Sequence, residues 1–151
     1  MQIVWKTSSF EELTTLELFD YLKLRQDVFV VEQECAYPDI DATDLKADHI
    51  LGWNDQTLVA CARLIPAGVT YEYPSIGRIA TSNKARGTGV GRLLMDESLA
   101  FMHQQYPGEK IKIGAQQRLE KFYQSYGFQT ASEMYLEDGI PHIDMLKSPS
   151  R

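Results

Sequence analysis

The chain has 151 residues, of which 44% are hydrophobic, enough to bury one full core and too few for two ordinary domains. A net charge of −6 argues against a nucleic-acid binder whose affinity rests on neutralising phosphates. No apolar run approaches the ~20 residues of a membrane-spanning helix, and the first residues lack the apolar core of a secretory signal. We therefore expect a single domain over residues 1–151, located in the cytoplasm, with neither a nucleic-acid nor a membrane partner.

Hydrophobic periodicity in the first third of the chain predicts a strand followed by a helix. Ile3 and Trp5 alternate with polar residues, as in a strand. The Ser-x-x-Glu spacing of Ser9 and Glu12 predicts a capping box at the start of a helix. We expect this helix to bury one stripe of residues that recur at three-residue steps: Leu13, Leu16, Phe19 and Leu22.

The remaining segments alternate between strand and helix patterns. A hairpin is predicted over 49–65, and a strand over 75–81 precedes a glycine-rich loop and an amphipathic helix. A second strand and helix are predicted over 111–127, and a last hairpin turns at Asp138-Gly139. The pattern predicts an α/β fold in which helices flank a mixed sheet.

The loop Arg86-Gly87-Thr88-Gly89-Val90-Gly91 opens a helix and therefore presents unpaired N–H groups, which suit a phosphate. A Walker loop is excluded because no Gly-Lys-Ser/Thr follows at the required spacing. The dinucleotide pattern fails because Arg92 stands where its third glycine belongs. What fits is Arg-x-x-Gly-x-Gly, from Arg86 to Gly91.

An acidic segment precedes the first hairpin and holds six carboxylates between Glu32 and Asp48. Two interpretations stay open, a solvated loop and a wall that attracts a cationic acceptor. Calcium is not expected, because an EF-hand register would need Asp or Asn at Thr43 and Gly at Asp44. The two cysteines lack metal-ligand spacing, so we expect no metal site and two reduced thiols.

The Arg-x-x-Gly-x-Gly loop resembles the acyl-CoA loop of the GNAT superfamily. A helix carrying Tyr123 four residues before Gly127-Phe128 is also similar to GNAT chains. Four further segments look like the ElaA-type branch: residues 24–33, residues 76–78, residues 115–116 together with 122–123, and residues 137–142. The resemblance covers nearly the whole chain and implies the GNAT acyl-CoA N-acyltransferase fold, with a mixed, mostly antiparallel sheet.

The resemblance also implies roles for particular residues. Acetyl-CoA would be the co-substrate, held by Ile79, Thr81, Arg86, Gly87, Thr88, Gly89, Gly91, Arg92 and Tyr123. Tyr123 would protonate the departing thiolate. Relatives often carry a Glu on the strand before the loop, where this chain has Gly77 and Arg78. The candidates for the general base are therefore Glu32, His49, Glu137 and His142.

The function implied is transfer of an acetyl group from acetyl-CoA to a primary amine by direct attack in a ternary complex. The alternative is a non-catalytic acyl-CoA sensor, favoured by the missing strand carboxylate. The acceptor stays open between a small amine, such as a polyamine or amino sugar, and a peptide or protein amine. Acyl length is open too, as is a homodimer formed through edge strands.

Overall fold

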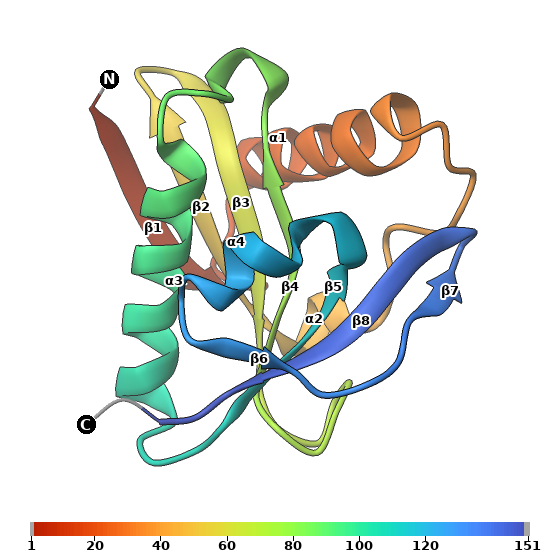
Figure 1. Cartoon of the computed structure of the whole chain (residues 1–151). Helices are drawn as coiled ribbons and strands as arrows, with labels where there is room; N and C mark the ends of the chain where they lie inside the picture. The colour runs from red at the N-terminus through yellow and green to blue at the C-terminus, as the bar shows by residue number, and fades with distance from the viewer. Residues whose placement is uncertain (1, 150–151) are drawn as a thin grey trace.

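The computed structural model describes residues 2–149 and forms one sheet between helices (Figure 1). The elements in chain order are β1 (Ile3–Ser9), α1 (Thr15–Arg25), the π-helix η1 (Gln26–Glu32), α2 (Thr43–Lys46), β2 (Asp48–Asn54), β3 (Thr57–Ile65), β4 (Ser75–Thr81), the 3-10 turn η2 (Asn83–Ala85), α3 (Val90–Gln105), β5 (Ile111–Gln116), the 3-10 turn η3 (Gln117–Leu119), α4 (Glu120–Gln124), β6 (Phe128–Thr130), β7 (Tyr135–Glu137) and β8 (Ile140–Lys147).

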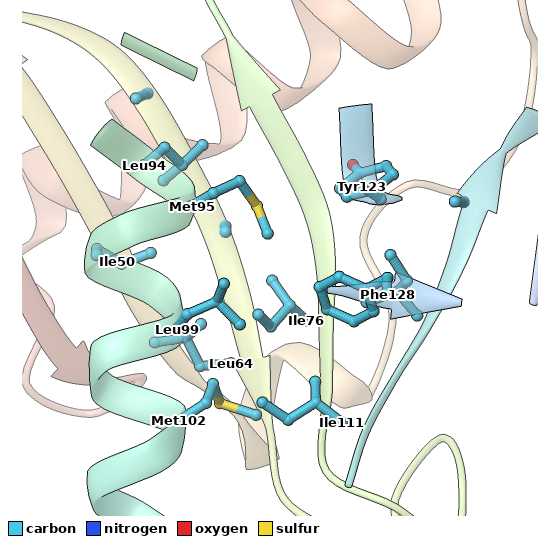
Figure 2. Close-up of a cluster of buried hydrophobic side chains, with 14 of the residues drawn as sticks. Ile50, Leu64, Ile76, Leu94, Met95, Leu99, Met102, Ile111, Tyr123 and Phe128 are labelled. Carbon is cyan, nitrogen blue, oxygen red and sulfur yellow. The ribbon is translucent and has the colours of Figure 1, made fainter. Parts of the chain in front are cut away.

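The sheet is mostly antiparallel, as expected, with strand order β1-β2-β3-β4-β5-β8-β6 and β7 paired to β8. The exception is the parallel contact between β4 and β5, whose register contains the single pair Ser75 and Lys112. Beyond that pair the two strands diverge towards their carboxyl ends (Figure 2). The sheet is therefore split in its middle, and the edge of β4 that faces β5 lacks a ladder partner.

One face of the sheet packs against α3 and α4 around the larger hydrophobic core (Figures 1 and 2). α3 directs Leu94, Met95, Leu99 and Met102 onto the strands, and Tyr123 and Phe128 continue the same core (Figure 2). The strands contribute alternate residues to this core, since successive side chains of a strand point to opposite faces of the sheet. These include Ile50, Leu64, Ile76, Ile111, Ile113 and Ile143.

The opposite face packs against α1 and η1 over β2, β3 and β4 through a smaller cluster. The buried helix residues there are Tyr21, Leu24 and Val28. The expected stripe was wrong, because Leu16 is 75% exposed and Phe19 is 63% exposed. Steps of three residues fall short of a full 3.6-residue turn, so the stripe rotates by about 60° at each step and leaves the buried face.

The first helix also begins later than expected. Ser9 is still in β1, where its extended backbone pairs with Asp48, so it cannot cap a helix. The capping box is formed by Thr14 and Glu17 instead: Thr14 Oγ1 accepts from the Glu17 N–H at 3.1 Å, and Glu17 Oε1 accepts from the Thr14 N–H at 2.9 Å. The last hairpin is confirmed, with positive φ at both Asp138 (51°) and Gly139 (78°).

Leu94→Ala should lower the free energy of unfolding by about 3 kcal/mol, because it empties a fully buried site that packed neighbours cannot refill. Leu93→Ala is the matched control, since Leu93 is 43% exposed on the same helix, and it should change stability by less than about 0.5 kcal/mol. Urea unfolding followed by circular dichroism measures both. Equal effects of the two substitutions would contradict this assignment of the core.

Candidate functional site

The glycine-rich loop leads from β4 through η2 into α3, and its backbone is set for an anion. Gly87 and Gly89 have φ of 80° and 88°, the left-handed region where a side chain is disfavoured. Gly89 is the N-cap of α3, so the first N–H groups of a 16-residue helix open towards the loop. Such a terminus binds phosphate groups through N–H donors and the helix dipole.

A cavity of about 220 Å³ lies at this loop. Its lining contains six of the residues predicted to hold the cofactor: Thr81, Arg86, Gly87, Gly89, Gly91 and Arg92. The three others are not part of that lining. Thr88 turns its hydroxyl back to the carbonyl of Ala85. Ile79 and Tyr123 lie on β4 and α4, which contribute Thr81 and Phe122 to the lining instead.

Arg86 is held across the loop by Glu32, at the end of the π-helix η1. Both terminal nitrogens of Arg86 contact the Glu32 carboxylate, and Nη2 also donates to the Thr81 carbonyl at 2.9 Å. The hydrogen bond from Arg86 lowers the pKa of Glu32. A phosphate that took over Arg86 would have to displace this carboxylate.

Arg92 joins the first turn of α3 to α4. Its guanidinium lies 5.9 Å from the ring centroids of both Phe122 and Tyr126. The Tyr126 hydroxyl donates to the Arg92 carbonyl at 3.1 Å. These contacts fix the position of α4, and hence of Tyr123, relative to the loop.

Tyr123 is nearly buried on α4, with its ring edge against Phe122 and Phe128 at 5.2 and 6.1 Å between centroids. Loss of solvation on burial raises the pKa of Tyr123 to about 12. The hydroxyl is therefore protonated at neutral pH, the state that a proton donor requires.

The structure does not bring His49 to this site. Its ring is fully buried, with Nδ1 2.7 Å from the Tyr21 hydroxyl and Nε2 2.8 Å from the Asp44 carbonyl. Burial lowers the pKa of His49, so the ring is neutral. In this position His49 links α1 to the acidic segment.

His142 lies on the other side of the split, on β8. Its Nδ1 is 2.7 Å from the Ile140 carbonyl, and its Nε2 is 3.5 Å from the Glu137 carboxylate. The ring stacks on Tyr135 with 6.0 Å between centroids. His142 and Glu137 are thus neighbours, whereas Glu32 lies at the glycine loop.

The acidic segment is only partly the solvated loop that one interpretation expected, because arginines bind three of its carboxylates and bury two of them, Asp39 and Asp44. Arg25 is fully buried on α1, and it contacts Asp44 through two nitrogens at 2.8 and 3.1 Å and Asp39 at 3.0 Å. Arg63 of β3 contacts Asp41 at 2.6 Å and Asp44 at 3.2 Å. Asp39 and Asp44 are thus buried in ion pairs, whereas Asp41 pairs with Arg63 and keeps 41% of its side chain exposed.

Arg78 extends the same network to β4, with Nε 2.8 Å from Asp39 Oδ1. Its φ of 46° is unusual for a non-glycine residue and coincides with a register shift between β3 and β4. Burial opposes the charge of Asp44, yet the hydrogen bonds and charge of Arg25 outweigh that cost and hold its pKa below the usual range. The sequence showed no signal for this network apart from an arginine between apolar positions of α1.

Cys61 is the buried one of the two cysteines. Complete burial raises the pKa of the Cys61 thiol to about 12, so this cysteine is unreactive.

Within residues 2–149, no three His, Cys, Asp or Glu side chains are grouped so as to hold a metal ion. No helix in the same range is both long and apolar enough to cross a membrane.

Comparison with known proteins assigns this arrangement to one family. Residues 25–149 match the family model described as an acetyltransferase (GNAT) domain. Protein ElaA of Escherichia coli strain K12 is 44% identical over 147 residues, with 96% of each chain covered. The crystal structure of Escherichia coli ElaA matches with a TM-score of 0.92 and 42% identity, and that of an acyl-CoA N-acyltransferase from Pseudomonas aeruginosa with 0.93 and 37%. Both alignments cover 97% of this chain and 100% of the other.

Asp44→Asn should lower the free energy of unfolding by about 3–5 kcal/mol, since it removes a charge that compensates two buried guanidinium groups. Because the folded pKa of Asp44 is depressed, its contribution is full above the unfolded value near ~3.9 and is lost as the pH falls through the folded value.

Chemical unfolding between pH 3 and pH 7 measures this effect. The stability of the wild type should fall more steeply below about pH 4 than that of Asp44→Asn. Asp96→Asn, on the exposed side of α3, is the control and should behave as the wild type. Parallel pH profiles for the wild type and Asp44→Asn would refute the role given to the buried network.

Proposed function

Because the chain belongs to the GNAT acetyltransferase family and, within it, to the ElaA-like branch, we propose that it transfers an acetyl group from acetyl-CoA to a primary amine. The observation that carries this proposal is the cavity at the glycine loop, which gathers the loop glycines with Arg86 and Arg92 beside an open strand edge. The amine attacks the thioester directly while both substrates are bound. No covalent enzyme intermediate is needed.

The CoA pyrophosphate binds at the loop, where Gly87, Gly89 and Gly91 leave the N–H groups accessible. Arg86 exchanges Glu32 for phosphate, and Arg92 supplies a second charge. The pantetheine arm follows β4, because the edge of that strand beyond Ser75 has no partner from β5. Backbone groups of Ile79 and Thr81 hold the arm and polarise the thioester carbonyl.

Proton transfer accompanies the attack. Tyr123 donates to the departing CoA thiolate, a role supported by its position four residues before Gly127-Phe128 on the helix whose Phe122 lines the cavity at the glycine loop. Glu32, Glu137 and His142 stay candidates for accepting a proton of the amine, directly or through water. His49 is set aside, since both of its ring nitrogens are bound in the interior.

One observation favours the alternative, a non-catalytic acyl-CoA sensor. At the β4 position where relatives often carry a Glu, this chain has Arg78, and that side chain is committed to Asp39. Turnover decides between the two functions, because a sensor binds acetyl-CoA without acetylating any amine.

The double substitution Arg86→Glu/Gly89→Asp should weaken acetyl-CoA binding by more than about 100-fold, because it removes a cation and puts two carboxylates where phosphates bind. Isothermal titration with acetyl-CoA, CoA and NADH measures this effect, and NADH should give no heat. The matched control is Lys110→Glu/Gly108→Asp, which makes the same charge change around another positive-φ glycine (77°). Failure of the well-folded wild type to bind either CoA species would overturn the proposal.

Tyr123→Phe should lower kcat by about 100-fold and leave the Kd for acetyl-CoA unchanged, because it deletes a proton donor and preserves the packing of the ring. A colorimetric thiol assay with a panel of amines measures kcat, and titration measures Kd. Tyr106→Phe removes a hydroxyl at the far end of α3 and should retain full activity. Undiminished kcat in Tyr123→Phe would exclude this residue as the donor.

A further inference from the structure

The face of the sheet opposite α3 is covered unevenly. The cluster under α1 and η1 draws its strand residues from β2, β3 and β4, and none of its described members comes from β5 or β8. On those two strands the alternate positions that avoid the main core are Lys112, Gly114 and Gln116 of β5 and Ile140, His142, Asp144 and Leu146 of β8, most of them polar. A polar surface therefore lies beside the split between β4 and β5.

Two tyrosines converge on Gly114 at the centre of this surface. A Cβ added at Gly114 would lie 2.8 Å from the Tyr71 hydroxyl and 3.2 Å from the Tyr135 hydroxyl. Gly114 itself is exposed, and its register partner on β8 is Asp144. The Tyr135 hydroxyl donates to Asp144 Oδ1 at 2.7 Å. Residues from four segments of the chain thus meet at Gly114, which has no side chain.

The position of Gly114 along the strand links this surface to the thioester. β4 and β5 pair at Ser75 and Lys112. Gly114 is two residues further along β5, where the two strands have begun to diverge. A pantetheine arm running along the free edge of β4 would thus reach the two hydroxyls. Two more residues along β5, Gln116 lines a second cavity, of about 250 Å³, with Ile140 and Pro141. This cavity offers room for the body of an acceptor.

The chain itself places an alkylammonium group in these surroundings. Lys112 Nζ lies 4.5 Å from the centroid of the Tyr71 ring and 3.6 Å from Asp144 Oδ2. An aromatic face and a carboxylate are the two groups that recognise an organic cation. Burial, then the charges of Asp144 and Glu137, raise the pKa of Tyr71, so its hydroxyl stays protonated in a region of negative potential.

We infer that Tyr71, Tyr135 and Asp144 form the acceptor site over Gly114 and that it takes an unbranched primary alkylamine, whose ammonium group replaces that of Lys112. The inference rests on the proposed acetyl transfer. The ammonium group passes one proton through the Tyr135 hydroxyl to Asp144 and on to solvent. The nitrogen then forms its bond to the acyl carbon as the C–S bond breaks, and its second proton leaves through water. The thiolate takes one proton from Tyr123, which regains a proton from solvent. One proton is released overall.

Steady-state kinetics with acetyl-CoA and n-butylamine test the site, with tert-butylamine as the branched isomer of equal charge. The wild type should acetylate n-butylamine at least 10-fold more efficiently than tert-butylamine. Tyr135→Phe and Gly114→Ala should each raise the KM for n-butylamine by about 10-fold, the first by losing a contact and the second by displacing the Tyr71 hydroxyl from its place over Gly114. Tyr106→Phe is the control and should keep the wild-type KM.

Titration with acetyl-CoA reports on folding in every variant, because its Kd should not change. A wild type that turns over n-butylamine, with Tyr135→Phe and Gly114→Ala both at the wild-type KM, would overturn the acceptor site and leave the proposed function intact. A wild type that binds no acetyl-CoA would overturn both. In Asp144→Asn the KM for n-butylamine should rise by about 10-fold while the Kd for acetyl-CoA stays the same, a split that a purely structural role for Asp144 would not produce.

Discussion

The layout of the site depends on the ion pairs that the buried guanidinium of Arg25 forms with two carboxylates. The guanidinium is fully buried, and it joins α1 to Asp39 and Asp44 in the segment between η1 and β2. Removing such a charge from water is costly, and only several well-directed partners offset that cost. The five donors of an arginine can meet two carboxylates at once, which one ammonium group does less well. The segment is therefore fixed against the sheet although it contains little regular structure.

That fixed segment determines which part of the sheet stays open. Arg63 and Arg78 bring β3 and β4 into the same network, so the sheet beneath α1 is closed by ion pairs as well as by apolar packing. The network ends at β4. Beyond it, β5 and β8 keep a polar surface, and the split between β4 and β5 connects that surface to the glycine loop. The cofactor and the acceptor would thus approach the split from separate sides.

Local patterns predicted the elements whose sequence determines their geometry. The glycine loop and the Asp138-Gly139 turn need positive φ, and the residues there tolerate it. Ile111, Ile113 and Ala115 alternate as a buried strand should. The first helix was placed less well, because pairing with Asp48 keeps Ser9 extended and moves the cap to Thr14. A strand partner 39 positions away in the sequence is invisible to a local pattern.

By itself the sequence determined the family, the mixed sheet and the glycine-rich turn into α3, because family motifs, hydrophobic alternation and glycine spacing are all local patterns. Only the tertiary structure decided which charged groups remain available. Three carboxylates of the acidic segment are bound to arginines from α1, β3 and β4, and His49 lies in the interior. Conversely, Tyr71, Tyr135 and Asp144 come together over Gly114 from segments with no shared motif. The physical reason is that ion pairing and burial depend on which segments the sheet brings together. The order of the strands cannot be read from the sequence of any single segment.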